Sequence, residues 1–139
     1  MAALKQNTYY RVNQVTTASR GQLLLTVYDG LLRFLAEGKQ AMQKQQYEKK
    51  NHYLKKAEDL IVVLLLTLDH TINPELASNL DRLYRYMYDR MVEANIHDDA
   101  HIVASMMQMA TDLRATWAEA ELVARRDDES YALAGGSML

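Results

Sequence analysis

One pair of side chains in the sequence has a spacing suited to metal chemistry. His97 and His101 lie four residues apart at an expected helix start, beside Asp98 and Asp99. Two histidines at that spacing share a helix face and could bind a divalent metal. Two exposed histidines near a capping aspartate would give the same pattern, and we favour that interpretation.

The other residue sets that carry catalysis are missing. A di-iron bundle needs Glu-x-x-His motifs on two helices, and the sequence contains none. It also lacks a Gly-x-Ser-x-Gly elbow, a glycine-rich phosphate loop and any cysteine. His52 and His70 are isolated, so structural roles suffice for them. We therefore expect no enzyme, no cofactor and no metal site.

Composition narrows the choice of partners and compartment. The 139 residues fit one domain, and a net charge of -2 argues against a nucleic-acid or membrane-surface binder. The absence of cysteine excludes disulfides and suits a reducing cytoplasm. The N-terminus lacks the apolar segment of a secretory signal. The longest apolar run, residues 60–66, is far shorter than the ~20 residues needed to span a bilayer.

The elements that must position any site are helices. The sequence contains one proline and five glycines, so few residues favour the tight turns of β-hairpins. Apolar residues recur at helical spacing in four long stretches joined by short connections, which predicts an all-α, antiparallel up-down four-helix bundle. We expect an N-terminal arm over 1–16, the bundle over 17–126, and a loosely ordered C-terminal tail over 127–139. The predicted helices cover about 17–42, 47–68, 74–95 and 99–126, with a turn at 43–46.

Local signals mark several helix ends. Ser19 opens a capping box at the first helix. Asn73 can cap the third helix, and Pro74 suits its first position. Asn95 tolerates the left-handed conformation that ends a helix, and Asp98 can cap the next one. These boundaries therefore have a residue whose chemistry favours them, whereas the turn at 43–46 has no such signal.

The predicted helices carry more apolar surface than one core requires. Tyr86 and Tyr88 cannot both share the core stripe that contains Tyr84 and Met87. Residues 60–66 are apolar nearly all the way round their helix. Methionines on the third and fourth helices are adaptable contacts as well as core fillers. This surplus favours a groove for amphipathic helices of another chain over an ordinary core.

Two other segments allow two interpretations each. The lysines at 49, 50, 55 and 56 are most simply a solvated face, and the alternative is a site for an acidic partner. Residues 1–16 show no sustained periodicity. They fit either a frayed terminus with a few docked side chains or a movable arm that covers a binding groove.

Residues spread in order along the chain carry a resemblance to a known family. They are Tyr10, Val15, Thr17-Ala18-Ser19, Leu23-Leu24-Leu25, Tyr28-Asp29-Gly30, Arg33-Phe34-Leu35, Asn51, Lys56-Ala57, Asn79-Leu80, Leu83-Tyr84, Tyr86-Met87, Glu93-Ala94-Asn95-Ile96, Asp98, Leu113-Arg114 and Trp117. This set resembles the flagellar secretion chaperone family FliS over about residues 10–120. Arg20 stands where the family often has proline. The family's glycine pair before the third helix is replaced by Ile72-Asn73-Pro74, which leaves the shape of that connection open.

The resemblance implies a fold, a partner and a location. It implies a four-helix bundle that binds the C-terminal region of flagellin in the cytoplasm and prevents premature filament assembly. It also implies delivery of flagellin to the flagellar type III export gate, with the chaperone's N-terminal arm near the groove. The family's tyrosines correspond to Tyr10, Tyr84 and Tyr86.

Together, the surplus surface and the resemblance predict a set of partner-binding residues. These are Tyr10, Val15, Tyr28, Leu64, Leu65, Leu83, Tyr84, Tyr86, Met87, Met106 and Met107. We expect no nucleic acid and no membrane insertion. Two alternatives remain open: a structural homo-oligomer that uses the same surface on itself, and a metal-binding bundle.

Overall fold

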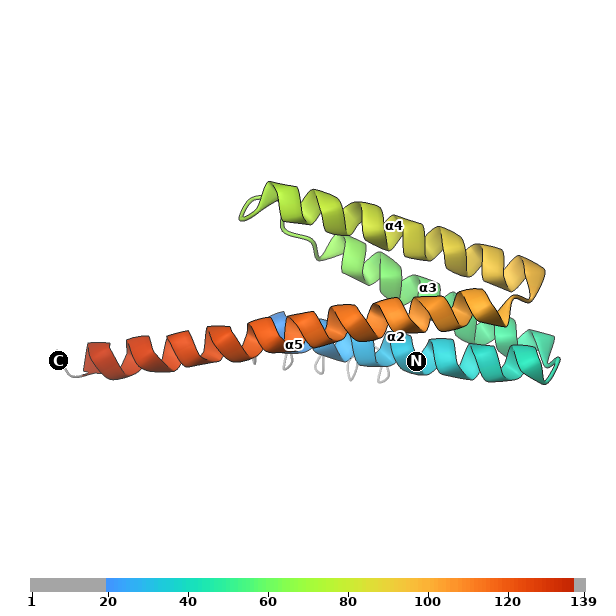
Figure 1. The fold of residues 1–139 in the computed structure, drawn as a ribbon, viewed down its shortest axis with the longest axis horizontal. Coiled ribbons are helices and arrows are strands. Elements are labelled where there is room, and N and C mark those ends of the chain that lie inside the picture. The colour runs from blue at the N-terminus through green and yellow to red at the C-terminus, as the bar shows by residue number, and fades with distance from the viewer. Residues whose placement is uncertain (1–19, 137–139) are drawn as a thin grey trace, which may run out of the picture. The chain divides into compact units, whose positions relative to one another are not determined.

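A computed structural model describes residues 20–136 of the chain. Four helices follow one another: α2 (Arg20–Gln43), α3 (Tyr47–Leu66), α4 (Pro74–His97) and α5 (Ala100–Gly136) (Figure 1). The described residues contain no β-strand. The chain divides into two compact units. Val27–Asp112 forms the bundle unit, and among the described residues, 20–26 and 113–136 form the terminal unit. The predicted all-α four-helix fold is confirmed.

Helices α2 and α3 pack antiparallel in the bundle unit. A Cβ added at Gly38 would lie 2.6 Å from Leu54 Cδ2, and one at Gly30 would lie 3.1 Å from Leu60 Cδ1. As residue numbers fall along α2 they rise along α3, so the two helices run in opposite directions. Glycine at position 38 therefore permits the close helix approach that offsets its low helix propensity, which is roughly 1 kcal/mol.

Helices α3 and α4 also run antiparallel and pack against each other; Figure 1 shows them side by side. Near the start of α3, the Lys50 Nζ donates to the Asn95 carbonyl oxygen at the end of α4, at 3.0 Å. The same ammonium forms an ion pair with Asp98. Lys50 is only 5% exposed, so its buried charge is compensated by the Asn95 carbonyl and by Asp98, which itself stays 43% exposed.

The core of the bundle unit comes from one stripe on each of the four helices. The Tyr28 and Tyr84 hydroxyls lie 2.7 Å apart and share a hydrogen bond between α2 and α4. Both rings are fully buried, so each hydroxyl needs such a partner. The other large, fully buried side chains are Leu31, Leu35, Leu54, Ile61, Leu64, Met87, Met91, Val103 and Met106.

Two of the predicted helix starts and one turn are confirmed. The Asn73 Oδ1 accepts a hydrogen bond from the Leu76 backbone N–H at 3.1 Å, and Pro74 is the first residue of α4. Gln45 has a φ of 59° in the turn that ends α2, and α3 begins at Tyr47 as expected. The expected Ser19 cap lies outside the described residues.

The predicted end of α4, at residue 95, was two residues too early. The helix continues through Asn95 to His97, and Asp98 adopts the left-handed conformation at φ 52°. Asp99, not Asp98, caps α5, because its Oδ1 accepts from the Ile102 N–H at 3.2 Å. Aspartate tolerates the left-handed region almost as asparagine does. The ion pair with Lys50 holds Asp98 at that position.

Helix α5 extends beyond its predicted end at residue 126 and reaches Gly136. The charged run that starts at Asp127 contains no proline, so nothing in it forbids helical backbone. Within the terminal unit, a Cβ at Gly21 would collide with the Glu121 carboxylate, so these two residues touch. None of the helices in the described part of the chain has the length and hydropathy to cross a membrane.

Candidate partner-binding surface

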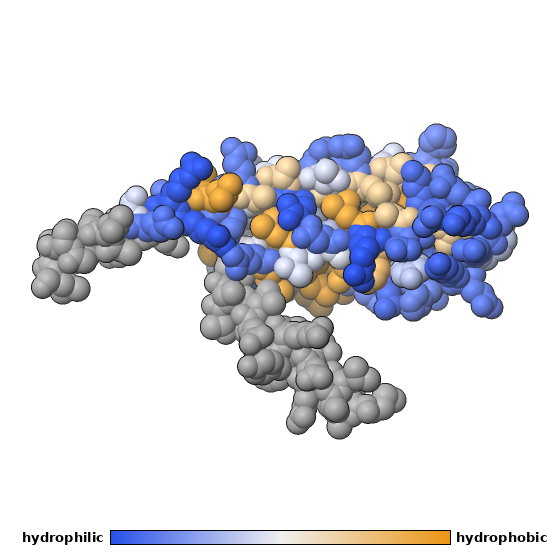
Figure 2. All heavy atoms as spheres, turned by 90° about the horizontal axis from the view of Figure 1, so that it is seen from below, coloured by the Kyte–Doolittle hydropathy of each residue, from blue (hydrophilic) through white to orange (hydrophobic). Residues whose placement is uncertain are grey.

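Large apolar side chains stay exposed around the connection between α3 and α4. On α3, Val62 is 39% exposed, Val63 38% and Leu66 80%. Ile72 in the connection is 83% exposed, and Leu76 in the first turn of α4 is 46% exposed. Figure 2, seen from below, shows a different face of the molecule, on which apolar side chains (orange) also reach the surface among hydrophilic ones (blue). The expected apolar surplus of residues 60–66 is therefore present at the surface and not sealed inside.

Helix α4 carries a second stripe beside its core stripe. It consists of Leu76, Asn79, Leu83, Tyr86 and Arg90, at steps of three, four, three and four residues. Tyr86 is 50% exposed and Leu83 is partly exposed, whereas the core stripe is buried. Residues at these steps share one helix face. We call this stripe the α4 ridge.

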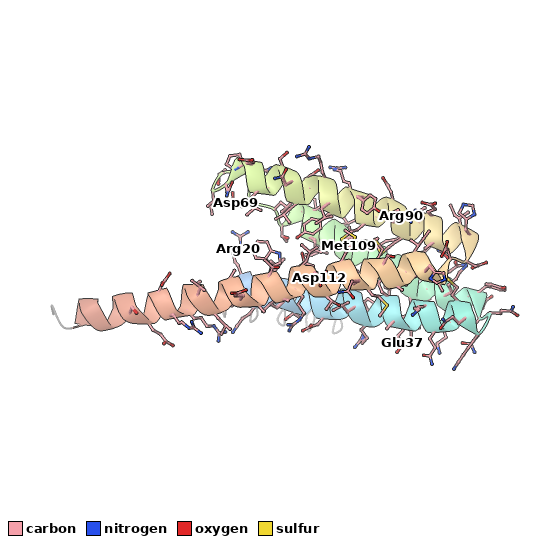
Figure 3. The ribbon with its side chains drawn as sticks, in the orientation of Figure 1. Arg20, Glu37, Asp69, Arg90, Met109 and Asp112 are labelled. Atoms are coloured by element: carbon pink, nitrogen blue, oxygen red, sulfur yellow. The ribbon has the colours of Figure 1, made fainter. Side chains whose placement is uncertain are left out.

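Two charged arginines lie at the α4 ridge: Arg85 beside it and Arg90 at its end. The Arg85 Nε lies 2.7 Å from the Asp81 carboxylate, and this hydrogen bond raises the pKa of Arg85. The Arg90 Nη1 lies 2.7 Å from the Glu93 carboxylate, which raises the pKa of Arg90. Figure 3 labels Arg90 on α4. The ridge is thus apolar along its middle and bordered by intrahelical ion pairs.

Five of the predicted partner-binding residues belong to the core. Tyr28, Leu64, Tyr84, Met87 and Met106 are each at most 1% exposed. The expectation that they line an open groove does not fit the structure of the free chain. Core and groove residues are both apolar and share the same periodicity, so spacing could not separate them. A partner would contact these five side chains only if the bundle opened.

Four predicted residues do reach the surface of the bundle unit. Tyr86 is exposed, and Leu65, Leu83 and Met107 are partly exposed. The argument that at least one tyrosine near Met87 must face outward is confirmed by Tyr86. A binding role for all four remains a prediction. Tyr10 and Val15 lie outside the described residues.

Sequence reasoning missed two exposed residues at this surface. By its spacing, Leu76 fits the core stripe of α4. However, it lies in the first turn of α4 and is 46% exposed. Ile72 was considered only as a departure from the family pattern. An isoleucine in a connection between helices does not belong to the buried face of any helix. Its position could therefore have indicated an exposed apolar residue.

His97 and His101 do not lie on one helix, as the possible metal site required. His97 is the last residue of α4, and His101 follows the left-handed Asp98 in the first turn of α5. The two side chains therefore do not share a helix face. Across the described residues, no group of three or more His, Cys, Asp and Glu side chains is placed to hold a metal ion.

Comparison with known proteins adds an independent line of evidence. The profile of the family described as "Flagellar protein FliS" matches residues 1–124. The flagellar secretion chaperone FliS of Bacillus subtilis is 38% identical over 127 residues, covering 91% of this chain and 94% of that protein. The flagellar secretion chaperone FliSB of Pseudomonas aeruginosa is 34% identical and covers 84% and 94%. The FliS chaperone of Escherichia coli is 32% identical, covering 78% and 80%.

Proposed function

The chain belongs to the FliS family of flagellar proteins, and from this premise we propose that it binds the C-terminal region of flagellin in the cytoplasm. Binding prevents premature polymerisation, and the chaperone then delivers flagellin to the flagellar type III export apparatus. The relatives are named flagellar secretion chaperones, which describes a binding protein and not an enzyme.

The exposed apolar surface is the observation that supports this proposal. The α4 ridge begins at Leu76, close in sequence to the exposed Ile72 and Leu66. An amphipathic helix recognises such a surface through anchors spaced three and four residues apart. The α4 ridge has the same three- and four-residue spacing on this chain. Apolar anchors of a flagellin helix would therefore pack between Leu76, Leu83 and Tyr86.

The energetics favour binding that can be reversed. Full burial of a Leu-sized side chain contributes roughly 1.5–3 kcal/mol, and the ridge side chains are already about half buried. Each therefore adds about 1 kcal/mol when a partner covers it. Ordering a disordered segment opposes this by roughly 2–5 kcal/mol. The three apolar ridge contacts alone roughly balance this cost, so net binding requires further exposed side chains such as Leu66 and Ile72.

Sedimentation with and without a flagellin C-terminal peptide tests the proposal. A one-to-one complex is the expected result. A stable tetramer that forms without the peptide and ignores its addition would support the structural homo-oligomer instead. In that case the exposed apolar surface would serve self-association.

A further inference from the structure

A second surface of different chemistry lies where α2 packs on α3. The Phe34 ring of α2 stacks on the Tyr53 ring of α3, with centroids 6.2 Å apart and planes at 29°. The Arg33 guanidinium carbon lies 5.1 Å from the Phe34 centroid, and the Lys56 Nζ lies 5.5 Å from it. We call these four residues the cationic aromatic patch.

The two cations of the patch are held in place but not neutralised. Arg33 and Lys56 are both exposed, and neither forms an ion pair with another residue in the range 20–136. Glu37, four residues after Arg33, has the spacing for an intrahelical pair that is not made. Contact with an aromatic face positions a cation while leaving its outer side free for an anion. The patch therefore presents two charges at fixed places.

An apolar ridge continues from the patch along α3. Tyr53, Lys56, Leu60 and Val63 follow at steps of three, four and three residues. Tyr53 and Leu60 are partly exposed, and Val63 is 38% exposed. Gly30 brings α2 close to Leu60, so the two helices form one surface here. A ligand on this surface would meet cations at one end and apolar side chains at the other.

The structure also separates the four lysines in the first half of α3. Lys50 is buried and paired with Asp98, so it takes no part in this surface. Lys49 and Lys55 are exposed, but no contact joins them to the rings of the patch. Asp29 on α2 and Asp59 on α3 are the nearby acidic residues in sequence, together with Glu37.

We propose that the cationic aromatic patch binds an acidic amphipathic segment of a partner protein. Carboxylates would pair with Arg33 and Lys56, and an apolar side chain of the same segment would pack on Leu60 and Val63. The planar guanidinium of Arg33 suits a carboxylate because it offers two parallel donors. This goes beyond the flagellin proposal, because the surface differs from the α4 ridge and selects negative charge.

Nucleic acid is the less suitable anion for this patch. Bases bind by stacking on open aromatic faces. Here Phe34 is already covered by two cations and stacked on Tyr53. The whole chain also carries a net charge of -2, which opposes a polyanion. A short acidic segment with an apolar residue matches the patch better.

Two synthetic helical peptides of identical length test the proposal on the intact chain. One places glutamates beside a leucine stripe, and the other replaces each glutamate by glutamine. Fluorescence anisotropy should show the glutamate peptide binding roughly tenfold more tightly. The R33Q/K56Q variant should abolish this preference. The K44Q/R126Q variant removes two exposed cations elsewhere, so it should bind like the wild type.

Phe34→Leu refines the test, because leucine keeps the apolar contact and removes the ring that positions the cations. The preference of this variant for the glutamate peptide should lie between that of the wild type and that of R33Q/K56Q. Equal binding of both peptides, or an equal loss in K44Q/R126Q, would overturn the proposal. So would a single-stranded oligonucleotide that binds more tightly than the glutamate peptide and depends on Arg33 and Lys56. None of these outcomes bears on flagellin binding at Tyr86, which is measured separately.

Discussion

Truncating Tyr86 gives the sharpest test of the α4 ridge. Tyr86 is 50% exposed at the middle of the ridge, so a bound helix can bury the remaining half of its ring. Half of a fully buried aromatic contribution is roughly 1–1.5 kcal/mol, which corresponds to about a fivefold to tenfold change in Kd. Tyr86→Ala should weaken binding of the flagellin C-terminal segment by that factor. Its effect on folding should be small, because the side chain is outside the core.

Tyr47 provides a matched control for this experiment. It is 49% exposed, and it begins α3, at the opposite end of that helix from Leu66. Tyr47→Ala therefore removes the same ring at the same exposure, away from the ridge. Isothermal titration calorimetry with the flagellin segment would give both dissociation constants. Circular dichroism at matched temperature would check that both variants keep their helices.

Two results would refute the reasoning about the ridge. Binding of Tyr86→Ala at wild-type affinity would show that the ring contacts no partner. If Tyr86→Ala and Tyr47→Ala weakened flagellin binding equally, the effect would come from a general loss of apolar surface and not from a site at the ridge. If the double variant Tyr86→Ala/Leu76→Ala bound flagellin more weakly than Tyr86→Ala, the bound segment would also contact Leu76. Leu76 is already 46% exposed, so its truncation should leave the core intact.

Three predictions on stability follow from the bundle unit, each measured by urea unfolding. Lys50→Met removes the ion pair with Asp98 and should lower the free energy of unfolding by roughly 1–3 kcal/mol. Gly38→Ala places a Cβ 2.6 Å from Leu54 and should cost about 1–3 kcal/mol through overpacking. Burial raises the pKa of Glu58 above its usual 4.5, so the folded state disfavours the charged form. The contribution of Glu58 to the free energy of unfolding should therefore fall as pH rises above 4.5, and Glu58→Gln should be more stable than the wild type at pH 7 but not at pH 4.

Similar residues serve as controls for the first two changes, and a comparison of pH values serves for the third. Lys49→Met removes an exposed lysine and should leave stability unchanged, so an equal loss would contradict the role given to Lys50. Gly30→Ala meets only the tip of Leu60 at 3.1 Å. Its clash is mild, and the gain in helix propensity of about 1 kcal/mol offsets it. If Glu58→Gln changed stability equally at both pH values, a cause other than ionisation would be required.

Local chemistry explains which parts of the fold could be predicted. Asn73 and Pro74 start α4 through contacts within one helical turn, so the sequence alone locates that boundary. At the end of α4, the left-handed Asp98 pairs with Lys50, which is distant in sequence. A local pattern contains no information about that pairing. Both Asn95 and Asp98 tolerate the conformation, and only the tertiary contact decides between them.

The candidate site was predictable in kind but not residue by residue. The period of α4 correctly separated Tyr86 from Tyr84, because they lie on different faces of one helix. The same reasoning could not show that Met106 is buried while Met107 is partly exposed, since adaptable residues suit either place. Leu76 fits the core stripe by spacing alone. Its exposure follows from its position in the first turn of α4.

The two stripes of α4 share no residue, and this separation gives the helix two independent roles. Ala77, Leu80, Tyr84, Met87, Met91 and Ala94 hold the bundle together. The ridge lies beside them and contributes little to the core, so its side chains can meet a partner without loosening the fold. Such an arrangement requires a helix with more apolar residues than its own packing uses. That excess carries an aggregation risk, which the ion pairs of Arg85 and Arg90 reduce by bordering the exposed apolar side chains with charge.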